Sequence, residues 1–228
     1  MEKASTKRGN SLSEVRVHEV IEVRHLTDTA YVLRMTKGSM DFIPGQYISI
    51  GKVASIDKRD YSIYSSPNDE YLEVLIKEVA DGMVSKSLRN MKPGEPIEVE
   101  GPFGFFQLKP DTLNERKHLF IASGTGISPF HSMVTSFPEL NYHLIHGVRY
   151  GADAYEKSIY PSNRITVCAS RDGKGDYYGR VTDWLKENPI DQSTYCYLCG
   201  NSDMINDAFD ILEAQGLPSE HIHAEVYF

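Results

Sequence analysis

The chain has 228 residues, of which 25% are charged and 40% hydrophobic, and its formal net charge is −8 at pH 7. This length is enough for two domains with separate cores, and no apolar run approaches the ~20 residues that a membrane-spanning helix requires. The negative charge argues against general nucleic-acid binding, because neutralising phosphates requires a basic surface.

Residues 1–14 form a polar N-terminal stretch that includes Lys3, Lys7 and Arg8. The stretch has no apolar run of the kind that makes up the middle of a secretory signal. We therefore expect a flexible leader on a cytoplasmic protein with no integral membrane segment.

From Val15 to Leu108 the sequence contains short strand-like runs separated by turn signals, which predicts a small antiparallel β-barrel. One helix is expected in DGMVSKSLRNM, where Met83, Leu88 and Met91 have near-helical spacing and Pro93 follows. The runs with a β-strand pattern are VRVHEVIEVRHL, AYVLRMT, QYISIG, DYSIYSS, YLEVLIKEV and PIEVEGPFG.

One stretch of this half, RDYSIYSS at residues 59–66, carries chemistry on both faces of a strand. Alternation places Arg59, Tyr61 and Ile63 on one face. It places Asp60, Ser62 and Tyr64 on the other face. A strand of this kind is not a simple edge with polar residues outside and apolar residues inside, and it suggests a ligand.

The polar segment Lys109–Lys117 is the expected domain boundary, because the periodicity changes after it. From His118 onward, strand-like runs alternate with helical patterns, which predicts an open parallel α/β sheet. We therefore expect three parts: a leader at 1–14, a barrel domain at 15–110 and an α/β domain at 116–228.

Two glycine-bearing motifs follow strands of the predicted parallel sheet. GTGISP (124–129) leads from the run HLFIAS into a helix, where glycines permit a tight turn and the close approach of a phosphate. CGNSDM (199–204) ends the later run YCYLCG, and ligands bind beyond the carboxyl ends of strands in such sheets. GTGISP alone is equally compatible with a plain strand-to-helix turn, and Cys199 of CGNSDM alone with a buried small hydrophobic residue.

The three cysteines, Cys168, Cys196 and Cys199, are too few for a disulfide framework or a four-thiolate cluster. Cys196 and Cys199 form a CxxC pair, but no second pair of ligands follows it, which argues against a zinc site. No metal is expected.

Taken in order, nine motifs resemble those of the ferredoxin–NADP reductase family of two-domain FAD flavoproteins, from about Val15 to Phe228. The motifs are FIPGQY, RDYS, DGMVS, GPFGFFQL, GTGISP, HGVRY, SR, CGNSDM and the terminal EVYF. The resemblance implies an N-terminal antiparallel β-barrel with a flavin-binding helix, and a C-terminal open parallel α/β sheet that binds NADP(H).

In the barrel, the resemblance assigns Arg59 to the FAD pyrophosphate, Tyr61 to the flavin ring and Ser62 to a hydrogen bond near flavin N5. A guanidinium suits phosphate oxygens, and an aromatic face suits a planar heterocycle. Backbone contacts to the flavin dinucleotide are expected from Ile76 and Lys77, and pyrophosphate contacts from Gly82, Met83, Val84 and Ser85.

In the second domain, the resemblance assigns the turn after HLFIAS to the nicotinamide dinucleotide, through Ser123, Gly124, Thr125 and Gly126. Cys199, Gly200 and Met204 would flank the place where nicotinamide meets flavin. NADP rather than NAD is expected from the cations that would face the 2′-phosphate, although Asp172 lies beside them. The residues assigned to this phosphate are Arg149, Ser170, Arg171 and Arg180.

At the C-terminus, the ending EVYF fits a family pattern in which a terminal aromatic covers the flavin, and either Tyr227 or the additional Phe228 would do so. Ser62 and Glu225 are the candidates for handling a proton near N5, and Cys199 is expected to be a positioning contact rather than a nucleophile. The expected catalytic residues are Ser62, Cys199, Glu225 and Tyr227.

The expected function is an FAD-dependent oxidoreductase that passes electrons between NADP(H) and a one-electron carrier, through orientation and exclusion of water. The expected partner of this monomer is a small acidic redox protein, ferredoxin or flavodoxin. The surface of this chain that receives the partner would use Lys58, Lys77, Lys86 and Arg89. Three alternatives stay open: the reductase component of an oxygenase system, a flavin-bearing subunit without nicotinamide turnover, and a non-catalytic NADP sensor.

Overall fold

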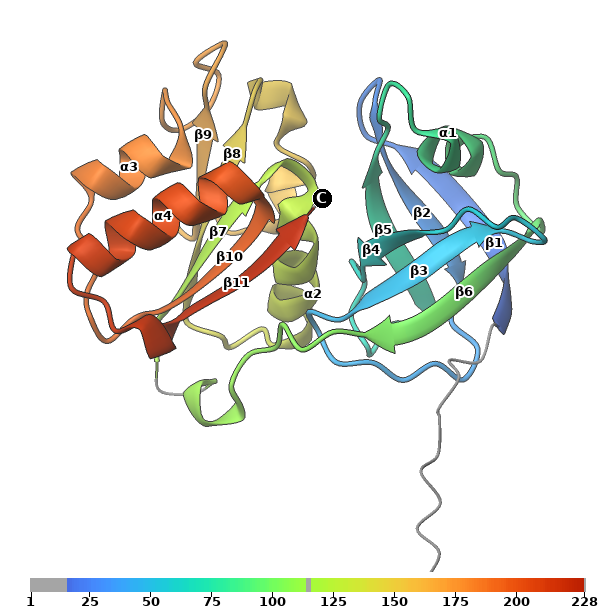
Figure 1. Ribbon diagram of the computed structural model, residues 1–228, viewed down its shortest axis with the longest axis horizontal. Coiled ribbons are helices and arrows are strands. Elements are labelled where there is room, and N and C mark those ends of the chain that lie inside the picture. Colours follow the sequence, from blue (N-terminus) through green and yellow to red (C-terminus); the bar gives the residue numbers. More distant parts are fainter. Residues whose placement is uncertain (1–15, 114–115, 228) are drawn as a thin grey trace, which may run out of the picture.

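A computed structural model describes residues 16–113 and 116–227. Two β-sheets lie side by side, an antiparallel sheet from the first half of the chain and a parallel sheet from the second half (Figure 1). This arrangement confirms the two-domain fold class predicted from the sequence.

The antiparallel sheet has six strands in the order β4-β3-β6-β1-β2-β5. A bridge between Ile63 and Val74, together with a hydrogen bond from the Tyr64 amide to the Glu73 carbonyl, joins its two edge strands. The sheet therefore closes into a barrel, which leaves no long unpaired edge. The strands are β1 (Arg16–His25), β2 (Ala30–Thr36), β3 (Tyr47–Lys52), β4 (Arg59–Ser62), β5 (Tyr71–Lys77) and β6 (Pro96–Phe103).

Helix α1 (Met83–Arg89) packs against the barrel, in the segment where the sequence predicts a helix. The expected apolar face is partly wrong, because Met83 is 73% exposed while Val84 and Leu88 are buried. Met83 is the first residue of the helix, and its side chain does not lie on the buried face that Val84 and Leu88 form.

The parallel sheet has five strands in the order β11-β10-β7-β8-β9. Each inner strand is apolar on both faces: Phe120 and Ala122 of β7 pack on the side of α2, whereas Leu119 and Ile121 pack on the side of α3 and α4. The elements are β7 (His118–Ser123), α2 (Ser128–Ser136), β8 (Tyr142–Val148), β9 (Ile165–Ala169), α3 (Val181–Glu187), β10 (Tyr195–Asn201), α4 (Ser202–Ala214) and β11 (Ile222–Tyr227).

The chain runs from β7 outward through β8 to β9, then returns to the other side of β7 to form β10 and β11. The strand order therefore reverses between β7 and β10, which is the place where open α/β sheets bind ligands. Strand β11 was not anticipated from the sequence, and it ends between the two domains (Figure 1). Within the described ranges no helix has both the length and the apolar character needed to cross a membrane.

Short 3-10 helices connect several of these elements. One of them, Gly124–Ile127, lies where the sequence predicts only a glycine turn, and it leads directly into α2. The others are Pro110–Thr112, Gly151–Asp153, Lys157–Ile159 and Ser219–His221.

Candidate functional site

A cavity of about 710 Å³ lies at the carboxyl ends of β7, β8, β9 and β10, where the strand order reverses. Most of its lining comes from the second domain, while Lys77 reaches it from the barrel. The cavity therefore borders both domains. Ten further lining residues were proposed as site residues from the sequence: Ser123, Gly124, Thr125, Arg149, Ser170, Arg171, Arg180, Gly200, Met204 and Tyr227.

The two glycine-bearing strand ends meet at this cavity because they are in close backbone contact. A Cβ on Gly126 would lie 2.2 Å from the Cys199 carbonyl oxygen, and one on Gly200 would lie 2.3 Å from Ser123 Oγ. Ser123 Oγ also accepts a hydrogen bond from the Asn201 amide at 2.9 Å. Only glycine permits this approach, so β7 and β10 present one continuous wall of backbone.

Gly124 differs from these two glycines, because a Cβ added to it would meet no atom within 4 Å. Its φ is +55°, and it lines the cavity. Open space over bare backbone is what the close approach of a dinucleotide phosphate requires, so this turn fits the expected nicotinamide dinucleotide.

Cations gather at one part of the cavity wall, after β8 and β9 and before α3. Arg149, Arg171 and Arg180 all line it, together with Ser170. The Arg171 guanidinium lies 5.8 Å from the Tyr150 ring centroid and donates to the Tyr150 hydroxyl at 3.3 Å. A group of guanidiniums beside a hydroxyl fits a phosphate dianion.

Asp172, which could have offered a carboxylate to this part of the cavity, is not among its lining residues. Its carboxylate accepts hydrogen bonds from the amides of Lys174 and Gly151, each at 3.1 Å. The Lys174 amide is the main cause that lowers the pKa of Asp172, and the Gly151 amide adds to it. The carboxylate therefore stabilises its own loop and joins that loop to the segment after β8.

The four expected catalytic residues form one cluster across the domain boundary. Ser62 Oγ donates to Glu225 Oε2 at 3.2 Å and accepts from the Tyr227 hydroxyl at 2.7 Å. Cys199 and Tyr227 lie close enough for each to shift the pKa of the other. The sheet pairing accounts for the meeting of Cys199 and Glu225, which lie opposite each other on β10 and β11.

Burial changes the protonation of this cluster. It raises the pKa of Glu225 to about 7, although the Ser62 hydrogen bond opposes that shift. Burial also raises the pKa of the Cys199 thiol well above its ordinary value. Glu225 can therefore hold or release a proton near neutral pH, whereas Cys199 remains a thiol, in line with a positioning contact.

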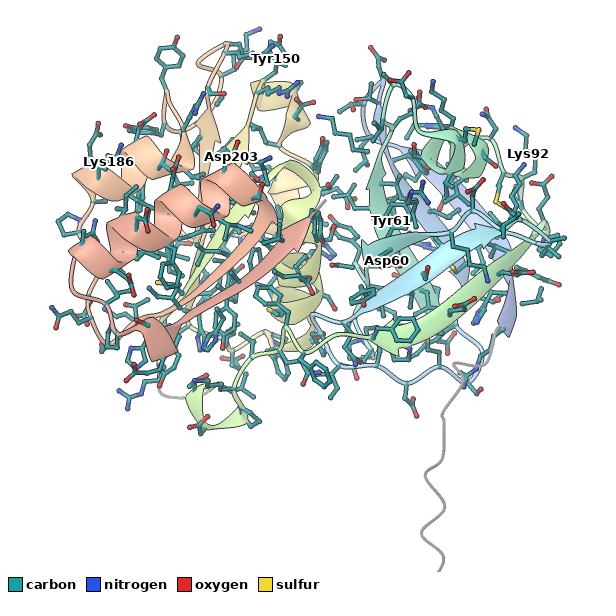
Figure 2. The ribbon with its side chains drawn as sticks, viewed as in Figure 1. Asp60, Tyr61, Lys92, Tyr150, Lys186 and Asp203 are labelled. Atoms are coloured by element: carbon teal, nitrogen blue, oxygen red, sulfur yellow. The ribbon has the colours of Figure 1, made fainter. Side chains whose placement is uncertain are left out.

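Asp60 and Tyr61 of β4 lie on the side of the barrel that faces the second domain (Figure 2). Arg59 is exposed. Within the described residues, its side chain makes one hydrogen bond, which goes to the Lys58 carbonyl at 2.7 Å. Its other donors are available to a phosphate. Burial raises the pKa of the half-buried Tyr61 to about 12, so it remains a neutral ring.

Three side chains in the next two barrel segments are packed more deeply than a ligand contact would allow. Ile76 is fully buried, and Val84 and Ser85 are nearly so. Ser85 Oγ accepts from the Val79 amide at 3.3 Å and donates to the Gly82 carbonyl at 3.4 Å. At Ile76, Gly82 and Val84, only backbone groups are thus suited to contact an FAD. For Ile76, a backbone contact is also what the sequence predicts.

Two of the four cations expected to receive a partner are engaged in ion pairs. Lys58 Nζ lies 2.9 Å from Glu98 and 2.5 Å from Glu100, and Arg89 Nε lies 3.7 Å from Glu78. The predicted docking surface is therefore weakened at these two residues. Strand pairing explains the first case, because Lys58 directly precedes β4, which pairs with β3, and β3 pairs in turn with β6, which carries both glutamates.

Several cavity residues were missed from the sequence. Asp153 and Tyr155 come from the segment after β8, and Asn201 and Asp203 come from the start of α4, where Figure 2 shows Asp203. Asn201 caps that helix by accepting from the Asp203 and Met204 amides. An Asn before a helical pattern is a cap signal, so the start of α4 was within reach of sequence reasoning.

Cys199 packs in a different hydrophobic cluster from the other two cysteines. Cys196 and Cys199 pack into different hydrophobic clusters, because residues three apart on a strand point to opposite faces. Cys168 is buried at the edge of the cavity, and burial raises its pKa to about 12. Phe228 lies outside the described residues.

Comparisons with known proteins identify both halves of the chain. Residues 14–108 match the model of the oxidoreductase FAD-binding domain, and residues 120–210 match that of the oxidoreductase NAD-binding domain. These matches confirm the expected pair of cofactor-binding domains.

Among curated proteins, the ferredoxin–NADP reductase of Azotobacter vinelandii is 30% identical, over 90% of this chain and 92% of that protein. The toluate 1,2-dioxygenase electron transfer component of Pseudomonas putida is 28% identical, over 91% of this chain. The chain spans 66% of that relative's length.

Among solved structures, a ferredoxin–NADP⁺ reductase from Neisseria gonorrhoeae with bound FAD and NADP has a TM-score of 0.81. The match covers 94% of this chain and 99% of that one at 21% sequence identity, and it shows the same fold. Together with the identity and coverage of the Azotobacter relative, the two domain models mean that the chain belongs to the ferredoxin–NADP reductase family of oxidoreductases.

Proposed function

We propose that the protein is an FAD-dependent oxidoreductase that passes electrons between NADP(H) and a one-electron carrier protein. The observation that carries the proposal is the cluster of Ser62, Glu225 and Tyr227, which joins the flavin strand of the barrel to the end of the chain. Tyr227 also lines the cavity that carries the cations. The two cofactor sites would therefore meet at these side chains.

When bound, FAD accepts a hydride as an electron pair and releases the electrons one at a time. The residues of this chain supply position and charge. Arg59 would bind the pyrophosphate, the face of Tyr61 would lie against the ring, and backbone groups from Ile76 to Ser85 would hold the rest of the dinucleotide.

Proton handling is assigned to Glu225 and Ser62. The Ser62 hydroxyl lies between Glu225 and Tyr227, so it can relay a proton between the carboxyl group and a ligand atom beside it. Cys199 and Gly200 would limit how a nicotinamide ring enters, and Tyr227 would cover the flavin until it does.

The preference for NADP rests on Arg149, Arg171 and Arg180. The carboxylates that line the cavity, Asp153, Asp203 and Asp207, come from segments after β8 and β10 rather than from the loop after β9 that carries Arg171. Arg171, whose own loop contributes no carboxylate to the cavity, favours a 2′-phosphate over a free ribose hydroxyl.

The second candidate is the reductase component of an oxygenase system. It is favoured by the similarity to the toluate dioxygenase electron transfer component, which covers most of this chain. In both cases the partner is a one-electron carrier. An acidic partner, a monomeric state and a cytoplasmic location remain predictions from the sequence.

The experiment separates these candidates by supplying the carriers directly. The flavin released from the purified protein is identified, and NADPH-dependent reduction is then measured with a ferredoxin, a flavodoxin and an isolated [2Fe–2S] oxygenase component. We expect FAD and rapid reduction of a ferredoxin or flavodoxin. Turnover with the oxygenase component alone favours the second candidate, and bound FAD that NADPH does not reduce contradicts the proposal.

A further inference from the structure

The second half of RDYSIYSS makes contacts that the proposed function does not use. Tyr64 is fully buried and stacks on His131 of α2, with ring centroids 3.7 Å apart and planes at 14°. His131 Nδ1 donates to the Tyr64 carbonyl at 2.8 Å, and Ser132 Oγ donates to the Ser65 carbonyl at 2.6 Å. Ser136 Oγ donates to Ser66 Oγ at 3.1 Å. One face of α2 is thus bonded residue by residue to the barrel.

Glu156 of the second domain binds the hydroxyl of Tyr64. Its carboxylate accepts a hydrogen bond from the Tyr64 hydroxyl at 2.7 Å and forms an ion pair with Arg24 of β1. Behind Arg24 the ion pairs continue, because Glu73 of β5 binds Arg24 at 3.5 Å and Arg34 at 2.8 Å. A carboxylate of one domain therefore completes a network of charges in the other.

The backbone at Glu156 is held in an uncommon conformation. Its φ is +49° and its ψ is +34°, a left-handed conformation that is unfavourable for a residue other than glycine. Only 17% of its side chain is exposed. Such a conformation persists where surrounding contacts over-determine it, and here those contacts come from Arg24 and Tyr64 of the barrel.

These contacts lie next to both cofactor sites. Tyr64 is two residues beyond Ser62, Tyr155 beside Glu156 lines the dinucleotide cavity, and α2 follows the glycine turn directly. A rotation of one domain would move these parts relative to each other. The group formed by Arg24, Tyr64, His131 and Glu156 is called the interdomain latch below.

We propose that Glu156 is a positioning residue, which through the interdomain latch fixes the angle between the two domains and so the alignment of nicotinamide with flavin. The inference rests on the proposed function for its kinetic consequence, but the fixed domain angle does not depend on it. Hydride transfer is sensitive to such alignment, since a displacement of about 1 Å can slow a reaction about 100-fold.

The first test measures the domain angle without any turnover. Spin labels are attached to cysteines introduced at Lys92 and Lys186, two exposed residues on the outer sides of the two domains (Figure 2). The native cysteines are buried and would not be labelled. Double electron–electron resonance on the FAD-loaded protein should give a narrow distance distribution, which Glu156→Gln broadens.

Two further variants make this result specific. Tyr64→Phe removes the hydroxyl that Glu156 binds and keeps the ring stack on His131, so it should broaden the distribution to a smaller degree. Glu139→Gln makes the same charge change at an exposed residue of the same domain and should leave it unchanged. A distribution that stays narrow in both latch variants overturns the proposal.

The second test measures flavin reduction at saturating NADPH by anaerobic stopped flow. Glu156→Gln should slow the limiting rate roughly 10- to 100-fold and weaken the nicotinamide–flavin charge-transfer absorbance. The affinity for 2′-phospho-AMP, which reports the nucleotide site alone, should stay the same. A broadened distribution with an unchanged limiting rate overturns the positioning role. Failure of the unsubstituted protein to be reduced counts against the proposed function instead, and leaves the distance measurement valid.

Discussion

The Tyr227 hydroxyl donates a hydrogen bond to Ser62 Oγ at 2.7 Å, across the boundary between the two domains. Glu225, on the same strand as Tyr227, accepts from the same Ser62 hydroxyl. The last strand of the chain therefore brings two titratable groups onto the residue that the sequence assigns to the flavin.

Glu225 should make the stability of the protein fall as pH rises from about 5 to about 8. Its pKa in the folded protein is about 7, because burial raises it from an ordinary value of 4.5. The folded state therefore keeps a proton that the unfolded state has lost, which favours folding at low pH and fades as pH passes 7. Replacement by Gln, which carries no charge, should remove this dependence.

The measurement is the melting temperature of the FAD-loaded protein and of Glu225→Gln at several pH values. The two should agree near pH 5, and the variant should be more stable by up to about 3 kcal/mol near pH 8, which corresponds to several degrees. Glu139→Gln, an exposed change of the same kind, is the control. A difference between Glu225→Gln and the unsubstituted protein that does not change with pH contradicts the assignment.

Arg171 should distinguish NADPH from NADH. Replacement by Ala removes a charged donor from the cationic part of the cavity, and KM for NADPH should rise roughly 10- to 100-fold while KM for NADH stays the same. Steady-state kinetics with both nucleotides checks the prediction. Lys174→Ala, an exposed cation in the same loop that does not line the cavity, should have little effect. Equal losses for both nucleotides would rule out a 2′-phosphate contact.

Gly126→Ala should weaken NADP⁺ binding by forcing β7 and β10 apart. The new Cβ would lie 2.2 Å from the Cys199 carbonyl oxygen and 2.7 Å from the Gly200 Cα. Those are backbone atoms of the cavity wall, so they have to shift, at a cost of about 1–3 kcal/mol.

Calorimetric titration of NADP⁺ and thermal unfolding measure the two effects of Gly126→Ala. Gly94→Ala is the matched control, because its φ of +84° makes alanine unfavourable while no atom lies within 4 Å. Both variants should lose stability, and only Gly126→Ala should lose affinity. Unchanged affinity in Gly126→Ala would show that the close contact does not shape the site.

The sequence predicts the fold and half of the residues that line the cavity, because both depend on local patterns. Alternation in the first half and strand-to-helix units in the second half are visible without a partner strand. The turns after β7 and β9 bring Gly124 and Arg171 to the same cavity because parallel strands end at one edge of their sheet.

The remaining features depend on contacts between distant residues. The Tyr64 hydroxyl donates a hydrogen bond to Glu156, which lies far along the chain. No sequence pattern around either residue indicates that the two are in contact. Similarly, Lys58 was expected to be a free cation because the strand pairing that brings it to Glu98 and Glu100 cannot be inferred from composition. Met83 was placed on the apolar face from spacing alone, whereas its position at the first turn of α1 leaves it exposed.

Anaerobic stopped-flow reduction of the FAD-loaded protein by NADPH and, in parallel, by NADH, followed by the visible absorbance of the flavin, decides whether this chain oxidises a nicotinamide cofactor and which one it prefers. We predict fast bleaching with a strong preference for NADPH, which Arg171→Ala reduces. Bleaching by NADH in preference would contradict the assignment of the cationic cavity. Absence of bleaching with either nucleotide would contradict the claim that this chain oxidises a nicotinamide cofactor.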